Sequence, residues 1–240
     1  PPIDSLRERR VMSLKTRLGN LGNILDEEPS QCDLLQLESP VLSNASFEAM
    51  KRYMGDTAAE VDCTFVPEGP GALTEALDRI RSEAEAAVRA GKTHLVLSDM
   101  NTGPDRAPVP MILAAGGVHT HLVREELRTF TSINVRSSEC LDVHYFAVLI
   151  GVGATTVNAY LAEEAIYDRH RRGLLEGLSV DDAVARKVDA AAKASRSSGG
   201  GVSGGENPYG ERHLETSLDK AMSMAFGGRT RDADDVTQER

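Results

Sequence analysis

The sequence lacks the long apolar segments that membrane proteins need. A membrane-spanning helix requires about 20 predominantly apolar residues, and the longest apolar run, residues 145–153, is far shorter. The N-terminus shows no basic segment followed by an apolar core, which is the pattern of a secretory signal. These absences predict a cytoplasmic protein with no membrane partner.

Aromatic and basic residues are also scarce. Aromatics make up 4% of the 240 residues and Trp is absent, so stacking platforms for single-stranded nucleic acid have little material. The 27 Lys and Arg residues are outnumbered by 37 Asp and Glu, which gives a formal net charge of −10. A chain of this charge repels phosphate backbones. We therefore expect no nucleic-acid partner.

Cysteine is rare and widely spaced. Cys32, Cys63 and Cys140 are odd in number and form no close pair. Disulfide frameworks use even numbers of cysteines, and zinc or iron–sulfur sites typically use closely spaced ones. The sequence therefore predicts inert thiols and no metal site.

Between residues 61 and 172, short β-rich runs alternate with amphipathic helical patterns. Strands are predicted at 61–66, 94–98 and 131–135, and helices at 73–91, 108–128, 141–150 and 155–172. Strands separated by helices of this length are typical of βαβ units with parallel pairing. The predicted fold class is α/β, with a largely parallel sheet and flanking helices.

The two ends of the chain are less regular. The first 60 residues predict a helix over 5–18 that Gly19 and Gly22 interrupt, an extended segment at 33–38 and a short helix at 44–54, all packed against the sheet. A Gly/Ser stretch at 195–208 predicts a flexible linker. Beyond it we expect a short helix at 214–226 and a disordered polar tail.

Polar residues follow the second and third predicted strands. They are Ser98, Asp99, Asn101, Arg136, Ser137 and Ser138. Ligands of open α/β sheets bind beyond the carboxyl ends of the strands, so these side chains could hold one. The same residue types are also ordinary turn formers and helix caps. Both interpretations stay open at this point.

Two glycine motifs are weak signals for nucleotide binding. Gly151 and Gly153 begin a dinucleotide fingerprint, but Thr156 occupies the third glycine position and the preceding segment is predicted to be helical. A tight turn between two helices is the expected structure. The run at 199–205 lacks the Gly-Lys-Ser/Thr ending of a P-loop.

Histidines and the terminal amine offer two further candidates. His119 and His121 would diverge by about 200° on a helix, and although His144 could add a third metal ligand, no carboxylate or thiol joins them at helical spacing. We expect these histidines to pair or to cap. Pro1 could act as a general base if it were held on a strand, but residues 2–5 lead straight into the start of the predicted helix.

Seven segments give the strongest indication of function, because their amino-acid sequences resemble those of one family, in the same order along the chain. They are residues 1–8, 11–19, 36–43, 106–110, 117–122, 144–154 and 157–162. The chain resembles the central domain of the glutamate synthase large subunit over residues 1–184. Residues 185–240 do not resemble that family, and we expect them to be a linker and tail.

The resemblance implies a fragment of a large enzyme that hydrolyses glutamine in an amidotransferase domain, passes ammonia through a tunnel and reduces 2-iminoglutarate at FMN. The family's central domain joins the two catalytic domains and has no catalytic residue of its own. The implied partners are the amidotransferase and FMN-binding domains, with the small subunit as a further candidate. FMN, a 3Fe-4S cluster and NADPH or ferredoxin belong to the parent enzyme, and no cofactor is expected in this chain.

Two other functions are compatible with the residues. The chain could be a stand-alone α/β module that binds a nucleotide or a small acid near Asp99 and Arg136. It could also be an interaction protein whose linker tethers the 214–226 helix. In each case we expect the isolated chain to be inactive as a glutamate synthase.

Overall fold

The computed structural model describes residues 14–175 and 177–199. Pro1, the 5–13 part of the first predicted helix, the glycine run beyond 199 and the predicted 214–226 helix lie outside these residues. The strands are β1 (Thr16–Leu18), β2 (Leu35–Leu37), β3 (Val41–Leu42), β4 (Ala58–Asp62), β5 (Thr64–Phe65), β6 (His94–Ser98), β7 (Ala107–Pro108), β8 (Ser132–Arg136) and β9 (Thr156–Asn158). The α-helices are α2 (Asn44–Met54), α3 (Ala72–Arg89), α4 (Met111–Arg124), α5 (Val143–Gly151), α6 (Tyr160–Arg171) and α7 (Val180–Gly199).

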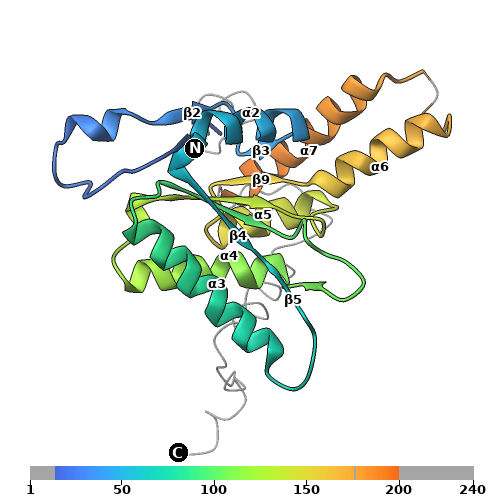
Figure 1. Cartoon of the computed structure of the whole chain (residues 1–240). Coiled ribbons are helices and arrows are strands. Elements are labelled where there is room, and N and C mark those ends of the chain that lie inside the picture. The colour runs from blue at the N-terminus through green and yellow to red at the C-terminus, as the bar shows by residue number, and fades with distance from the viewer. Residues whose placement is uncertain (1–13, 176, 200–240) are drawn as a thin grey trace, which may run out of the picture.

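A five-stranded parallel sheet organises the described chain, in the order β3-β9-β8-β6-β4 (Figure 1). The predicted α/β class and the parallel pairing are therefore confirmed. Two antiparallel pairs, β1 with β2 and β5 with β7, lie outside this sheet. In Figure 1, α2 and the β1–β2 hairpin lie on one side of the sheet, and α3 and α4 lie on the opposite side.

Helix ends follow the local sequence. The Ser43 side chain accepts a hydrogen bond from the Ser46 amide and so caps α2, which spans the predicted 44–54. After α3, Gly91 has a φ of +87°, and the amides of Gly91 and Lys92 donate to the carbonyls of Val88 and Ala87. This Schellman ending needs a left-handed residue, which glycine supplies at little steric cost.

The segment 155–172 corrects the sequence prediction, because it is not a single helix. It holds β9, which lies between β3 and β8, and only then α6. A three-residue strand is too short to show its own periodicity, so pairing with its neighbours decides its structure. Gly153, with a φ of +113°, therefore makes a turn from a helix to a strand, and the predicted turn between two helices is wrong.

Three other boundaries differ from the prediction. Residues 16–18 form β1 and not a helix, because they pair with β2. The strand predicted at 61–66 begins at Ala58 and divides at Cys63 into β4 and β5. Helix α4 begins at Met111, since Pro108 belongs to β7 and Pro110 is the residue before the first turn.

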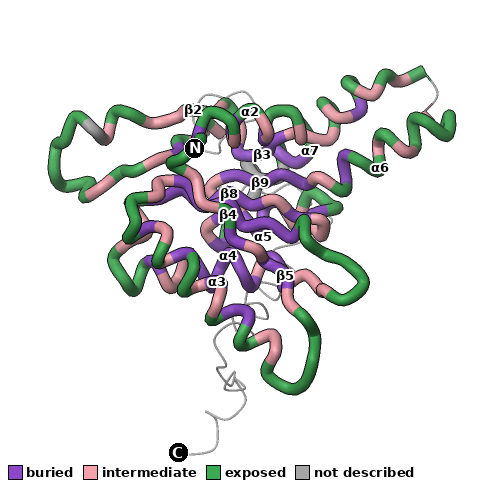
Figure 2. The backbone as a smooth tube through the Cα atoms, in the orientation of Figure 1, coloured by how far each residue is buried: buried purple, intermediate pink, exposed green. Residues whose placement is uncertain are grey.

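Alternation along the strands gives the sheet two different faces. One face presents apolar side chains to α3, α4 and α5 in a single core, including Leu95, Leu97, Ile133, Val135 and Val157. A smaller apolar cluster on the other face joins Val96 to Phe47 of α2 and Leu18 of β1. Figure 2 shows that buried residues gather along the sheet, while the connection from β1 to β2 is exposed.

Helix α7 extends the fold past the predicted beginning of the linker. It packs against α5 and α6, and Ala191 is a fully buried member of the core. The helix continues to Gly199, so the first residues of the Gly/Ser stretch are helical. Among the described residues, no helix is both long and apolar enough to cross a bilayer.

Candidate functional site at the carboxyl edge of the sheet

Asp99 is the centre of the predicted polar group, and it is fully buried just after β6. The Ser138 amide donates to its carboxylate at 2.8 and 3.1 Å, and the Ser138 hydroxyl donates at 2.9 Å. The Ser137 hydroxyl adds a longer bond of 3.3 Å. The carboxylate therefore ties the end of β6 to the turn after β8, and its oxygens are occupied by groups of the chain itself.

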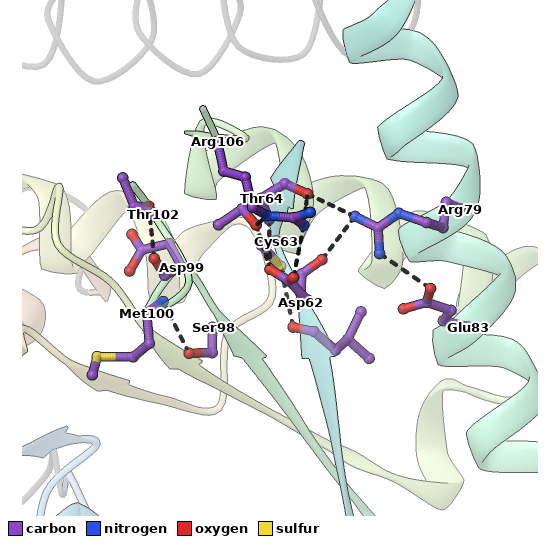
Figure 3. Close-up of polar contacts among 11 residues, drawn as sticks. Asp62, Cys63, Thr64, Arg79, Glu83, Ser98, Asp99, Met100, Thr102 and Arg106 are labelled. Atoms are coloured by element: carbon purple, nitrogen blue, oxygen red, sulfur yellow. Dashed lines mark hydrogen bonds and ion pairs between the residues drawn. The ribbon is translucent and has the colours of Figure 1, made fainter. Parts of the chain in front are cut away.

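A second polar cluster lies at the end of β4 (Figure 3). Arg106 donates to the Asp62 carboxylate at 2.9 Å and to the Thr64 hydroxyl at 2.9 Å. Arg79 of α3 donates to the carbonyls of Asp62 and Thr64, both at 2.9 Å, and to Glu83 at 3.1 Å. Arg106 therefore joins the connection after β6 to the β4–β5 segment, and Arg79 joins helix α3 to the same segment.

The charge of Asp62 is stabilised in this cluster. Burial favours the neutral acid, but hydrogen bonds from Thr64 and Asn101 and the charge of Arg106 outweigh it and lower the pKa of Asp62. An ionised carboxylate that is already bound by an arginine is a poor proton acceptor. The cluster is therefore suited to holding loops in place.

Arg136, at the end of β8, faces α2 and not Asp99. Its guanidinium lies 5.4 Å from the centre of the Phe47 ring and 5.7 Å from that of Tyr160, and it donates to Glu48 at 2.7 Å. Rings on two elements and a carboxylate on α2 hold this side chain. The predicted polar group therefore forms two neighbouring clusters: Asp99, Ser137 and Ser138 come together in one, and Arg136 lies in the other. Tyr160 joins them, because its ring faces Arg136 and its hydroxyl hydrogen-bonds with Asp99 and Ser138.

Sequence reasoning missed several residues of this edge. They are Asp62, Thr64, Arg79, Arg106, Glu48, Asn158 and Tyr160. Asp62 would have been found by the same rule that selected Asp99, had the first strand been predicted to end at 62. Asn158 required recognition of β9, whose three residues give no periodic signal.

The predicted histidine pairing is confirmed for two residues of α4. His119 accepts a hydrogen bond from Arg128 at 3.0 Å, and His121 lies 2.7 Å from Glu85 of α3. Burial and the charge of Arg128 lower the pKa of His119. A Cβ at Gly153 would clash with the His119 ring, so this glycine allows a close approach. The described residues contain no group of three His, Cys, Asp or Glu side chains suited to a metal ion.

The cysteines are free thiols in different surroundings. Cys32 is exposed, whereas Cys63 and Cys140 are buried. Burial raises the pKa of Cys63 to about 12 and also raises the pKa of Cys140. Both buried thiols are therefore protonated near neutral pH, and a protonated thiol is a weak nucleophile.

A chain of hydrogen bonds crosses the α2-facing side of the sheet. The Thr156 hydroxyl donates to Asn134 Oδ1 at 2.8 Å, and Asn134 Nδ2 donates to the Ser132 hydroxyl at 3.1 Å and to the Leu95 carbonyl at 3.0 Å. Ser132 Oγ lies 2.8 Å from His94 Nδ1. All four side chains are buried. This network joins β9, β8 and β6 with hydrogen bonds in place of apolar contacts.

The fold and its edge define a helix-covered parallel α/β domain whose polar groups mainly bind one another. A sequence model of the glutamate synthase central domain matches residues 1–199. The chain belongs to this family.

Individual relatives agree with that assignment. The chain is 69% identical over 186 residues to the glutamate synthase [NADPH] large chain of Azospirillum brasilense, an alignment that covers 77% of this chain and 12% of the relative. It is 41% identical to the chloroplastic ferredoxin-dependent glutamate synthase of Spinacia oleracea, covering 68% and 10%. Identity to the glutamate synthase [NADH] of Saccharomyces cerevisiae is 36%, covering 76% and 9%. The chain therefore spans about a tenth of the length of these relatives.

Proposed function

We propose that this chain is the central connecting domain of a glutamate synthase large chain. It joins the amidotransferase domain to the FMN-binding domain and helps to shape the route of ammonia between them. It takes part in converting glutamine and 2-oxoglutarate to glutamate, and it contributes no catalytic residue. The observation that supports this proposal is the 69% identity over 186 residues to an NADPH-dependent large chain.

The geometry of the carboxyl edge supports a connecting role. The carboxylates of Asp99 and Asp62 accept hydrogen bonds from side chains or amides of the same chain. Substrate-binding groups normally leave donors or acceptors free for the ligand. These groups instead fix the connections that follow the strands, which gives a neighbouring domain a rigid surface.

The cysteines of this chain do not suit the iron–sulfur cluster that the resemblance implies for the parent enzyme. An iron–sulfur cluster needs thiolates that converge, whereas Cys63 and Cys140 are buried with raised pKa values and Cys32 is exposed on a different element. We therefore assign the cluster, like the FMN-binding domain, to other parts of the large chain. The relatives include enzymes named for NADPH, NADH and ferredoxin, and no electron donor is proposed for this chain.

Reassembly from separate polypeptides tests the proposal. The full 240-residue chain is combined with an amidotransferase domain and an FMN-binding domain of a glutamate synthase, and co-purification and glutamine-dependent glutamate formation are measured. We expect both to depend on the chain, with no activity for the chain alone. The matched control omits only this chain. The proposal would be contradicted if the polypeptides neither associated nor formed glutamate. Thermal stabilisation of the chain by a nucleotide would favour the binding-module alternative.

A further inference from the structure

Two buried polar atoms on the α2-facing side of the sheet have no hydrogen-bond partner in the described part of the chain. They are Nε of Arg136 and Oδ1 of Asn158. Buried polar groups in folded proteins are paired in the great majority of cases, because an unmade hydrogen bond costs the group its desolvation free energy. The two atoms are of opposite type, since one is a donor and the other an acceptor.

The fold places these two residues next to each other. Arg136 of β8 and Asn158 of β9 are register partners in adjacent parallel strands. Register partners project from the same face of a sheet, and neighbouring strands are about 4.8 Å apart. The donor and the acceptor therefore belong to one small region between β8, β9 and helix α2.

The orientation of each group is determined by its other contacts. Arg136 lies between the rings of Phe47 and Tyr160 and donates through Nη1 to Glu48 at 2.7 Å. Because the charge of Arg136 is already paired, a neutral acceptor would satisfy its free Nε–H donor.

The amide of Asn158 is equally constrained. Its Nδ2 donates to the Leu42 carbonyl at 3.1 Å and to Asn44 Oδ1 at 2.9 Å. Exchanging the two ends of the amide would place its oxygen against the Leu42 carbonyl, which can only accept. The atom of Asn158 without a partner is therefore Oδ1, which requires a hydrogen-bond donor.

We propose that Arg136 Nε and Asn158 Oδ1 form a binding site for one water molecule that accepts from the arginine and donates to the asparagine. An anion without a hydrogen, such as chloride, cannot donate to Asn158, and a cation such as ammonium cannot accept from Arg136. Because both atoms are buried, a peptide segment from another domain cannot reach them, whereas a molecule enclosed during folding can. The bound water joins β8 to β9 at the point where α2 covers the sheet, and the site is independent of the function proposed above.

Water-to-protein NMR on the full 240-residue chain, with ¹⁵N-labelled arginine, tests this site. We expect a cross-peak between water and Hε of Arg136 whose sign is that of a long-lived dipolar contact and not of proton exchange. Arg128 is the matched control, because its partly buried Nε already donates to His119 at 3.0 Å, and it should show no such cross-peak. Loss of the signal in Arg136→Lys assigns it, and its retention in Tyr160→Phe excludes relay through the Tyr160 hydroxyl.

A high-resolution crystal structure provides a second measurement that needs no variant. The expected result is one density peak within hydrogen-bond distance, about 2.7–3.2 Å, of both Arg136 Nε and Asn158 Oδ1. The inference is overturned if Nε donates directly to Oδ1. It is equally overturned if the Arg136 Hε resonance is resolved and shows no dipolar contact with water.

Discussion

The two faces of the parallel sheet are buried by different physical means. On the side of α3, α4 and α5, the strands present an uninterrupted apolar layer that includes Leu97, Val135 and Val157. On the side of α2, Asn134 and Thr156 are equally inaccessible to solvent, and each forms hydrogen bonds to the chain itself. One face is therefore stabilised mainly by removal of apolar surface from water, whereas the other combines a smaller apolar cluster with hydrogen-bonded polar groups.

This difference explains why the strands alternate in sequence. Parallel strands that are covered on both faces usually read as continuous apolar runs, whereas β8 alternates Ser132, Ile133, Asn134, Val135 and Arg136. The apolar layer tolerates any well-packed side chain of similar volume. The polar layer accepts only groups that donate and accept in the right places, so it restricts how α2 and the strands can be arranged.

The largest expected effect comes from breaking the apolar face. Leu97→Ala removes a fully buried side chain from the larger core, and truncation of such a leucine costs about 2–5 kcal/mol because a cavity remains. Urea unfolding followed by circular dichroism measures the loss. Val123→Ala on α4 is the control, since Val123 is 51% exposed and should change stability by less than about 0.5 kcal/mol. Equal effects of the two substitutions would contradict this account of the core.

A smaller loss of unfolding free energy is expected on the polar face, and it should come from an unpaired acceptor and not from a cavity. Thr156→Val keeps the shape of a fully buried side chain but removes the donor to Asn134 Oδ1. The bare oxygen should cost about 1–3 kcal/mol of unfolding free energy. Urea unfolding of the single variants and of the double variant with Asn134→Leu forms a cycle.

The double variant distinguishes pairing from simple packing. Once Asn134 is replaced, loss of the Thr156 hydroxyl leaves no bare oxygen, so the second substitution should cost less than it does alone, by an amount on the order of 1 kcal/mol. Strictly additive losses would show that the two side chains contribute independently. The buried polar network would then have no role as a unit.

The same contrast explains how much could be predicted from the sequence. The residues of β6, α2 and α3 show clear periodicity and caps, and their predicted ranges agree closely with the structure. Asp99 with Ser137 and Ser138 was found by its position after two strands. Arg136 was predicted at the edge, but its contacts with Glu48 and Phe47 depend on α2, which lies far away in sequence. Such pairings follow from the topology, which local patterns do not specify.

The smallest expected effect is on the pH dependence of the unfolding free energy. Burial on the polar face lowers the pKa of His94 below its ordinary value of 6.5, so the unfolded chain binds a proton more readily than the folded one. Stability contributed by neutral His94 is complete above about pH 6.5 and falls as the pH decreases toward the lowered folded value. His94→Gln should therefore flatten the fall of unfolding free energy between about pH 7.5 and pH 5, as measured by urea unfolding.

His119, whose pKa is lowered by burial and by Arg128, provides the comparison on α4. His119→Gln should remove a separate part of the pH dependence, and the unfolding free energy of the double variant should depend less on pH than that of either single variant. If His94→Gln leaves the slope unchanged, the polar face does not hold this histidine neutral.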